Sequence, residues 1–170
     1  MVLLVAFVAL PAFAAAEVAV GVQPVPITLE KDLGGKVDGS TWSSSDIKGK
    51  IYTLVYVDPD MKDLNPKMEE ALKQEAFPKD KYGSIAVINM GATWKPNFIL
   101  DSILKDKQEK FPNTIYVKDL KKTLVKEWGI ADDNYDVLIF DKDGKIIFRK
   151  DGQLSDDEIK ALVALIRKSL

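Results

Sequence analysis

The chain of 170 residues contains neither cysteine nor histidine. Without a thiol it can form no disulfide bond and has no thiolate to act as a nucleophile. Cysteine and histidine are also the usual zinc ligands, and histidine is the side chain best suited to proton transfer near neutral pH. These two absences exclude cysteine-based redox chemistry and conventional zinc sites, and they exclude more functions than any motif in the chain supports.

An excess of charge of one sign is also lacking. Lys and Arg total 24 against 26 for Asp and Glu, and the two signs are interspersed along the chain. No basic stripe is available to neutralise a phosphate backbone, so we expect no nucleic-acid partner. Hydrophobic residues make up 46% and charged residues 29%, which is typical of a globular protein. Residues 17–170 fit a single domain of ordinary size.

The N-terminal 16 residues carry no charged side chain. An apolar run over 2–10 is followed by Pro11 and by small residues up to Ala16, which is a signal-peptide pattern, although the usual positively charged start is missing. The apolar run is shorter than the roughly 20 residues that span a bilayer. We therefore expect a removable signal peptide at 1–16 and a periplasmic or secreted mature protein without a membrane span; a buried N-terminal segment of a cytosolic protein is the alternative.

The order of apolar runs and turn signals indicates the fold class. β-branched and aromatic residues predict strands at 51–57, 84–90, 114–117, 137–140 and 145–149. Helices are predicted after Asn65, Pro96, Asp119 and Ser155. A hairpin or two short strands around a glycine turn form an N-terminal extension over 17–48. This order predicts an α/β, three-layer thioredoxin-like sandwich, with a central mixed sheet and helices on both faces.

Several short segments together resemble a known family. They are Trp42, Gly49-Lys50, Phe77-Pro78-x-Asp80-x-Tyr82, Ile88-Asn89, Phe111-Pro112, Trp128 and Asp141-Lys142-Asp143-Gly144. In this order they resemble the YtfJ family of secreted bacterial proteins over nearly all of the mature chain, and more distantly the periplasmic relatives of TlpA and the peroxiredoxins. The resemblance implies a thioredoxin-like fold without active cysteines and brings no established activity with it.

The positions of the redox site hold other residues in this chain. In redox-active relatives the first central strand is followed by the reactive cysteine, whereas this chain has Asp58-Pro59-Asp60-Met61-Lys62-Asp63. The position of the relatives' cis-proline is held by Tyr135. The segment Ala92-Thr93-Trp94-Lys95-Pro96 resembles a catalytic-loop sequence with Lys95 in place of cysteine, but that alignment leaves too little chain for the second crossover. We interpret it as a loop after the second strand.

Asp58, Asp60 and Asp63 cluster just after the first central strand, where open α/β sheets bind ligands. Their carboxylates predict a possible Ca²⁺ or Mg²⁺ site, and no other cofactor is expected. Asp58 and Asp60 also suggest a metal-assisted phosphohydrolase. Its conceivable helpers are Thr93, Lys95, Asp132 and Asp133. The competing interpretation is a solvated helix start, where acidic residues favour the positive end of the helix.

Our preferred hypothesis is a non-catalytic binding or interaction module. The scaffold would present its former active-site face to a periplasmic protein or a small ligand. That face would contain Trp94, Lys95 and Tyr135 beside the 58–63 loop. The alternative is a divalent-cation-binding or metal-assisted hydrolase domain centred on Asp58 and Asp60.

Overall fold

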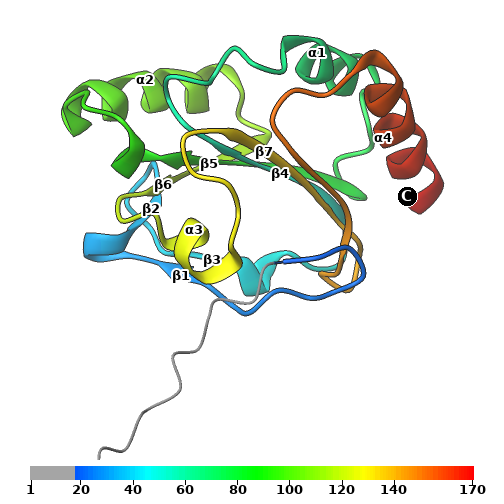
Figure 1. Cartoon of the computed structure of the whole chain (residues 1–170), viewed down its shortest axis with the longest axis horizontal. Coiled ribbons are helices and arrows are strands. Elements are labelled where there is room, and N and C mark those ends of the chain that lie inside the picture. The colour runs from blue at the N-terminus through cyan, green and yellow to red at the C-terminus, as the bar shows by residue number, and fades with distance from the viewer. Residues whose placement is uncertain (1–17) are drawn as a thin grey trace, which may run out of the picture.

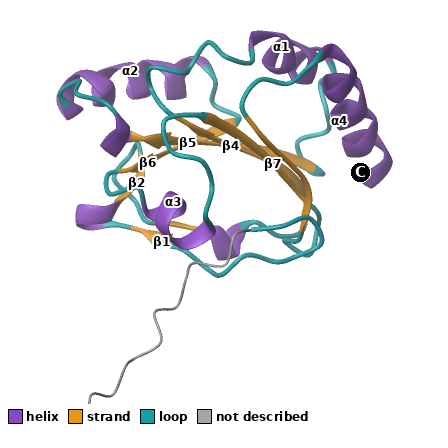
Figure 2. Cartoon of the chain, in the orientation of Figure 1, coloured by secondary structure: helices purple, strands orange, loops and turns teal. Residues whose placement is uncertain are grey.

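A computed structural model describes residues 18–170, so the signal peptide predicted at 1–16 lies outside the described residues. Its main element is a six-stranded sheet with the order β2-β6-β5-β4-β7-β8. Figure 2 draws the strands in orange. The strands are β2 (Gly34–Lys36), β4 (Ile51–Val57), β5 (Tyr82–Asn89), β6 (Thr114–Asp119), β7 (Tyr135–Phe140) and β8 (Ile146–Asp151). β4, β5 and β6 are parallel, and the other three pair antiparallel with their neighbours. The sheet is therefore mixed, as predicted.

Helices cover both faces of this sheet. Helices α1 (Pro66–Gln74), α2 (Asn97–Lys110) and α4 (Asp156–Ser169) lie on one face, and α3 (Thr123–Trp128) lies on the other with the N-terminal extension (Figure 1). No helix within residues 18–170 combines the length and the apolar character needed to cross a membrane. The three-layer arrangement predicted from the order of elements is present.

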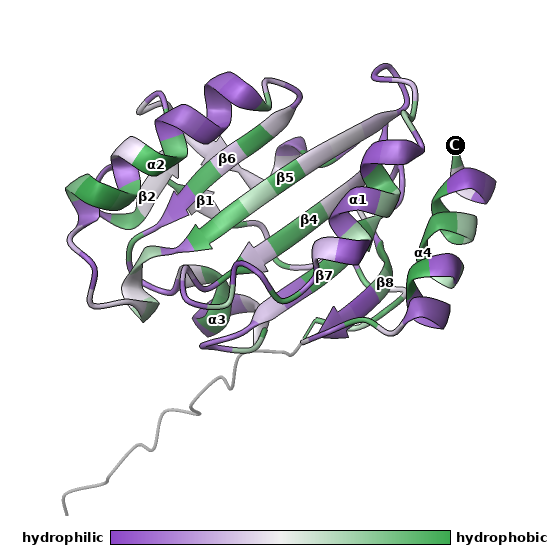
Figure 3. Ribbon diagram, turned by 90° about the horizontal axis from the view of Figure 1, so that it is seen from above, coloured by the Kyte–Doolittle hydropathy of each residue, from purple (hydrophilic) through white to green (hydrophobic). Residues whose placement is uncertain are grey.

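The core consists of apolar side chains on both faces of the sheet, and green, hydrophobic segments are visible on β4 and β5 in Figure 3. On the α1 and α4 side, Met68 and Leu162 pack with Val137. On the α3 side, Trp42 and Trp128 are buried, as expected for Trp128. Burying one large apolar side chain contributes about 1.5–3 kcal/mol, so these layers supply the main stabilisation. The two tryptophans are not available to line a surface groove.

The N-terminal extension forms separate strands and no hairpin. β1 (Thr28–Leu29) pairs with β3 (Trp42–Ser43), whereas β2 joins the edge of the main sheet beside β6. Gly34 explains how β2 comes so close. Its φ is +129°, and a Cβ there would lie 1.9 Å from the carbonyl oxygen of Lys118. Only glycine allows this backbone path.

Three of the four predicted helix starts are confirmed in position, those after Asn65, Pro96 and Ser155. The prediction that Asp119 caps the third helix was wrong, because Asp119 ends β6 and α3 begins at Thr123. For α4 the capping box is complete, because Glu158 N donates to Ser155 Oγ (3.3 Å) and Ser155 N donates to Glu158 Oε2 (2.7 Å). Helix α1 begins after Asn65 as predicted, but the Asn65 side chain makes no capping bond. Its Nδ2 donates to the Gly152 carbonyl (3.1 Å), and its Oδ1 accepts from Leu154 N (2.9 Å). Asn65 therefore ties α1 to the segment between β8 and α4.

Candidate functional site

A row of buried polar residues marks the carboxyl ends of the three parallel strands. Asn89 ends β5 and lies opposite Asp119, which ends β6. Val57 of β4 lies opposite Ile88, so Asp58, the next residue, lies beside Asn89. Asp58, Asn89 and Asp119 are all buried. This edge is where open α/β sheets place their ligands, and two loops, 58–65 and 90–96, leave the sheet from it.

Asp58 is part of the structure beneath the 58–65 loop. Its Oδ1 accepts a hydrogen bond of 2.8 Å from the backbone N–H of Asp60. Burial raises the pKa of Asp58, and the negative charges of Asp60 and Asp133 add to the effect, while the Asp60 N–H opposes it. A buried carboxyl group that already shapes its own turn has little freedom to meet a ligand from solvent.

Asp60 connects the two loops. The Lys95 ammonium donates to Asp60 Oδ1, and Thr93 Oγ1 donates to Asp60 Oδ2 at 3.1 Å. The hydrogen bond from Lys95, followed by that from Thr93, lowers the pKa of the Asp60 carboxyl. The 58–65 and 90–96 loops, which the sequence analysis expected side by side, are thus brought together, with Lys95 as the counter-ion of Asp60.

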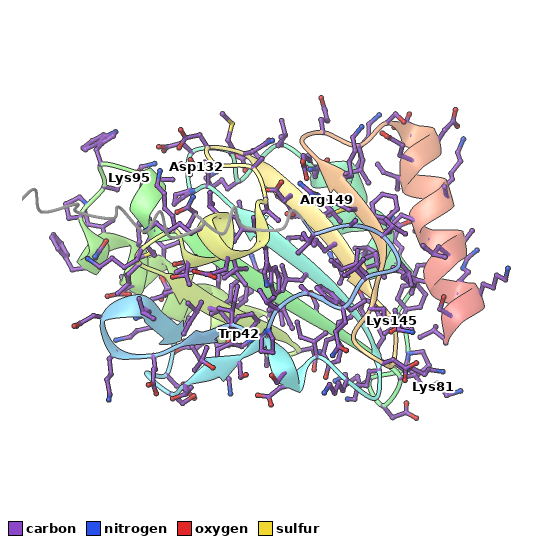
Figure 4. All side chains as sticks on the ribbon, turned by 60° about the horizontal axis from the view of Figure 1, so that its bottom comes forward. Trp42, Lys81, Lys95, Asp132, Lys145 and Arg149 are labelled. Carbon is purple, nitrogen blue, oxygen red and sulfur yellow. The ribbon has the colours of Figure 1, made fainter. Side chains whose placement is uncertain are left out.

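A second polar contact joins the 129–134 loop to the same edge. Asp132 accepts from Asn89 Nδ2 at 2.9 Å and from the Lys122 ammonium at 2.6 Å. Burial alone would raise the pKa of Asp132, but these two hydrogen bonds outweigh it and lower the pKa. Figure 4 shows Asp132 and Lys95 toward one end of the molecule, with Lys81 and Lys145 toward the other. Sequence reasoning missed Asn89 and Lys122 as members of this cluster.

The three carboxylates predicted to bind a cation do not converge. Asp58 is buried, Asp60 is paired with Lys95, and Asp63 is exposed and paired with Lys62. Within the described part of the chain, no group of three or more acidic side chains is placed to hold a metal ion. Binding of Ca²⁺ or Mg²⁺ at these residues stays a prediction, with Lys95 as a competitor for Asp60.

Large apolar side chains are exposed at this same end. Trp94 is 85% exposed, Phe98 in the first turn of α2 is 72% exposed, and Met61 in the 58–65 loop is 41% exposed. Met61 follows Asp60 and Trp94 precedes Lys95, so the ion pair holds the two apolar residues at one edge. We call Met61, Trp94 and Phe98 the Trp94 surface. Sequence reasoning singled out Trp94 but missed Met61 and Phe98, because the sequence of a loop or of a first helical turn does not show which apolar side chains stay exposed.

Tyr135 requires a correction. It was expected on the partner face, but it is only 1% exposed, and every residue of β7 is buried. Its hydroxyl donates to Glu69 Oε1 of α1 at 2.8 Å. Burial, followed by the negative charge of Glu69, raises the pKa of Tyr135. Tyr135 therefore fastens α1 to the sheet and does not face a partner.

Comparison with known proteins places these observations in a family context. The family model described as "Bacterial protein of unknown function (YtfJ_HI0045)" matches residues 19–169. The "Uncharacterized protein YtfJ" of Escherichia coli (strain K12) is 26% identical over 158 residues, which cover 88% of this chain and 84% of that protein. An uncharacterized protein of Haemophilus influenzae is 28% identical over 129 residues, which cover 74% of this chain and 70% of that protein.

Solved structures confirm the thioredoxin-like fold. The pneumococcal lipoprotein thioredoxin Etrx1 from Streptococcus pneumoniae has a TM-score of 0.59 at 21% identity and covers 85% of this chain and 99% of its own. A putative thiol:disulfide interchange protein DsbE from Chlorobium tepidum has a TM-score of 0.61 at 18% identity, and the match covers 90% of this chain and 99% of that one. A peroxiredoxin-like protein from Aquifex aeolicus has a TM-score of 0.64 at 14% identity, and the match covers 92% of this chain and 91% of that one. At these identities the similarity concerns the fold alone.

Proposed function

Because the chain belongs to the YtfJ_HI0045 family of bacterial proteins of unknown function and has a thioredoxin-like fold without cysteine, we propose that it is an exported binding module. It is not a cysteine-based thiol oxidoreductase, since thiol–disulfide exchange needs a thiolate. The proposed location is the periplasm or the cell exterior, which the uncharged, apolar segment 1–16 supports. The proposed partner is another exported protein with an apolar segment.

The observation that carries this proposal is the exposure of Trp94 and Phe98. Aromatic side chains in contact with water at 85% and 72% exposure are costly to leave uncovered in a folded protein. Covering one such side chain is worth about 1.5–3 kcal/mol, and tryptophan is enriched among the residues that dominate protein interfaces. The surface stands at the carboxyl ends of the parallel strands, where open α/β sheets bind ligands, and the Asp60–Lys95 pair joins its two loops.

Paired surface variants test the proposal. Tagged protein would be used to recover partners from envelope extracts, and the affinity of each recovered partner would then be measured with purified components. We expect Trp94→Ser with Phe98→Ser to weaken binding by about 100-fold, which corresponds to losing roughly 2.7 kcal/mol. Phe111→Ser is the matched control, because Phe111 is also an exposed aromatic residue but follows the other end of α2. Equal affinities for both variants would contradict the proposal.

The metal-assisted hydrolase has weaker support. Asp60 already has a cationic partner in Lys95, and Asp58 is buried beneath its own loop. A hydrolase of this type needs carboxylates free to bind a metal ion at an open position.

A further inference from the structure

The outer edge of β6 is only partly covered by a neighbouring strand. β2 lies at the end of the sheet, and its three residues pair with the second half of β6. One further main-chain hydrogen bond follows, from Val37 N to the Tyr116 carbonyl at 3.2 Å. Because β6 begins at Thr114, its first residues extend past the strand that covers the rest. Free N–H and C=O groups on such an edge can pair with another chain.

β2 does not extend further, because its chain turns back directly after Lys36. Gly39 N donates to the Lys36 carbonyl, and Lys36 N donates to the Ser40 carbonyl, both at 2.9 Å. The first of these bonds closes a β-turn. Both bonds also occupy main-chain groups of Lys36 that would otherwise face outward from β2. The beginning of β6 is therefore left to another part of the chain.

The side chain of Gln108, in the last turn of α2, takes the place of the missing strand. Its Nε2 donates to the Thr114 carbonyl at 2.8 Å, and its Oε1 accepts from Tyr116 N at 3.2 Å. A carboxamide offers the same kinds of donor and acceptor as the main chain, so a residue of a paired strand would satisfy these two groups in the same way. Gln108 thus continues the line of β2 after the chain of β2 has turned away.

Other contacts hold α2 beside this edge of the sheet. The Lys118 ammonium of β6 donates to Asp101 Oδ1 of α2 at 3.0 Å. Asp101 and Gln108 are separated by about two helical turns, so they lie on the same side of α2. Leu100 and Leu104 are buried where α2 packs on the sheet. Because these contacts do not involve Gln108, replacing Gln108 should leave α2 docked.

The surroundings of the edge would favour association of two copies once it is open. Phe111 is 41% exposed, and Ile115, which lies between the two bonded residues of β6, is 37% exposed. Without Gln108 each copy would present one unpaired donor, the Tyr116 N–H, and one unpaired acceptor, the Thr114 carbonyl. The donor of one copy complements the acceptor of the other, and identical surfaces can meet across a two-fold axis.

We propose that Gln108 closes the edge of β6 to a second copy of this chain, as a side-chain substitute for an edge strand. The surface that it closes is the start of β6 together with Phe111 and Ile115, and the partner that fits this surface is the same surface on another molecule. While the carboxamide bonds Thr114 and Tyr116, these two groups are unavailable to an incoming strand. This inference goes beyond the proposed function and does not depend on the Trp94 surface.

Substitution of Gln108 tests this closure. Gln108→Leu removes both hydrogen bonds and keeps a side chain of similar size. We expect the mature chain with this substitution to self-associate as its concentration rises, which sedimentation velocity measures. At low concentration its Tyr116 amide should exchange about tenfold faster than in the wild type, and this difference should shrink as copies pair. Gln108→Ala removes the amide without adding apolar surface and should behave in the same way, so the test does not depend on one variant folding.

Matched variants separate the open edge from other effects of the substitution. Glu109→Leu adds the same leucine at the exposed neighbouring position and should keep the association state of the wild type. Gln108→Glu should keep it too, because a negative charge on the edge of each copy repels the other. The association of Gln108→Leu should persist when Trp94→Ser and Phe98→Ser are added, which distinguishes it from contact through the Trp94 surface. A Gln108→Leu protein that associates no more than the wild type or Glu109→Leu would overturn the proposal.

Discussion

The Lys95 ammonium donates a hydrogen bond to the Asp60 carboxylate, and this contact joins the loop after β4 to the loop after β5. Both side chains are partly exposed, so solvent screens the pair and its contribution to folding stability is small. The pair instead fixes the positions of Met61, which follows Asp60, and of Trp94, which precedes Lys95. This edge of the sheet thereby displays Met61 and Trp94 side by side as an exposed apolar surface.

Charge reversal tests this positional role. We expect Lys95→Asp and Asp60→Lys each to weaken partner binding several-fold while changing the melting temperature little, because each removes a screened pair and leaves like charges in contact. The double reversal should restore most of the affinity, since it rebuilds the pair with its signs exchanged. Affinities of the three purified variants, measured beside their melting curves, check this. A double variant as weak as the singles would argue against the pair as the organising contact.

Asn65 provides a prediction on stability. Its buried side chain bonds the carbonyl of Gly152 and the N–H of Leu154, so Asn65→Ala leaves two main-chain groups without partners. The expected cost is about 1–3 kcal/mol in the free energy of unfolding. Urea denaturation measures it, with Asn97→Ala at an exposed position as the control. A loss below about 0.5 kcal/mol would mean that water replaces both bonds.

Cation binding has a simple thermal test. Because Lys95 occupies Asp60 and Asp58 is buried, we expect the melting temperature to change by less than about 1 °C when Ca²⁺ or Mg²⁺ is added, in the wild type and in Asp60→Ala alike. A ligand that binds only the native state would raise the melting temperature with its concentration. A rise in the wild type that disappears in Asp60→Ala would establish the cation site and favour the hydrolase hypothesis.

The capping box of α4 predicts a loss of stability in acid. The hydrogen bond from Lys150, followed by those from Ser155, lowers the pKa of Glu158 to about 2. A depressed carboxyl pKa gives stability that is present above the unfolded value of about 4.3 and is lost as pH falls through the folded value. Glu158→Gln retains the box without the charge. The wild type should therefore have a higher melting temperature than Glu158→Gln near neutral pH. This difference should shrink below about pH 4.3.

Thermal melts across the acid range measure that difference. Glu109→Gln, at an exposed position of α2, is the matched control. A difference between the wild type and Glu158→Gln that stays constant down to about pH 2 would show that the charge of Glu158 does not stabilise α4.

Elements with a local signal were predictable from the sequence. The β-branched run of β4, the Asp141–Gly144 turn between β7 and β8, and the Ser155–Glu158 box each lie within a few residues of chain. The edge position of β2 had no such signal, because Gly34 pairs with Asp119, which is half the length of the chain away in sequence. The periodicity of a segment indicates a strand but does not name its partner.

The candidate site was predictable only in its location. Asp58 and Asp60 follow a central parallel strand, as predicted, whereas ligand binding at this edge stays a prediction. The contact between Asp60 and Lys95 depends on how two crossover loops pack, and the two residues are far apart in sequence. Tyr135 was expected to face a partner but lies in the core, because every residue of β7 is buried. Burial on this scale is a property of the assembled layers and not of the strand sequence.

Site-specific photo-crosslinking tests the central claim most directly. A photoreactive phenylalanine analogue would replace Trp94, and in a second protein it would replace the exposed Lys81, which lies toward the opposite end of the molecule (Figure 4). Irradiation in the intact envelope should attach the same partner at position 94 and none at position 81. A partner captured equally at both positions, or at position 81 alone, would contradict a binding surface built on Met61, Trp94 and Phe98.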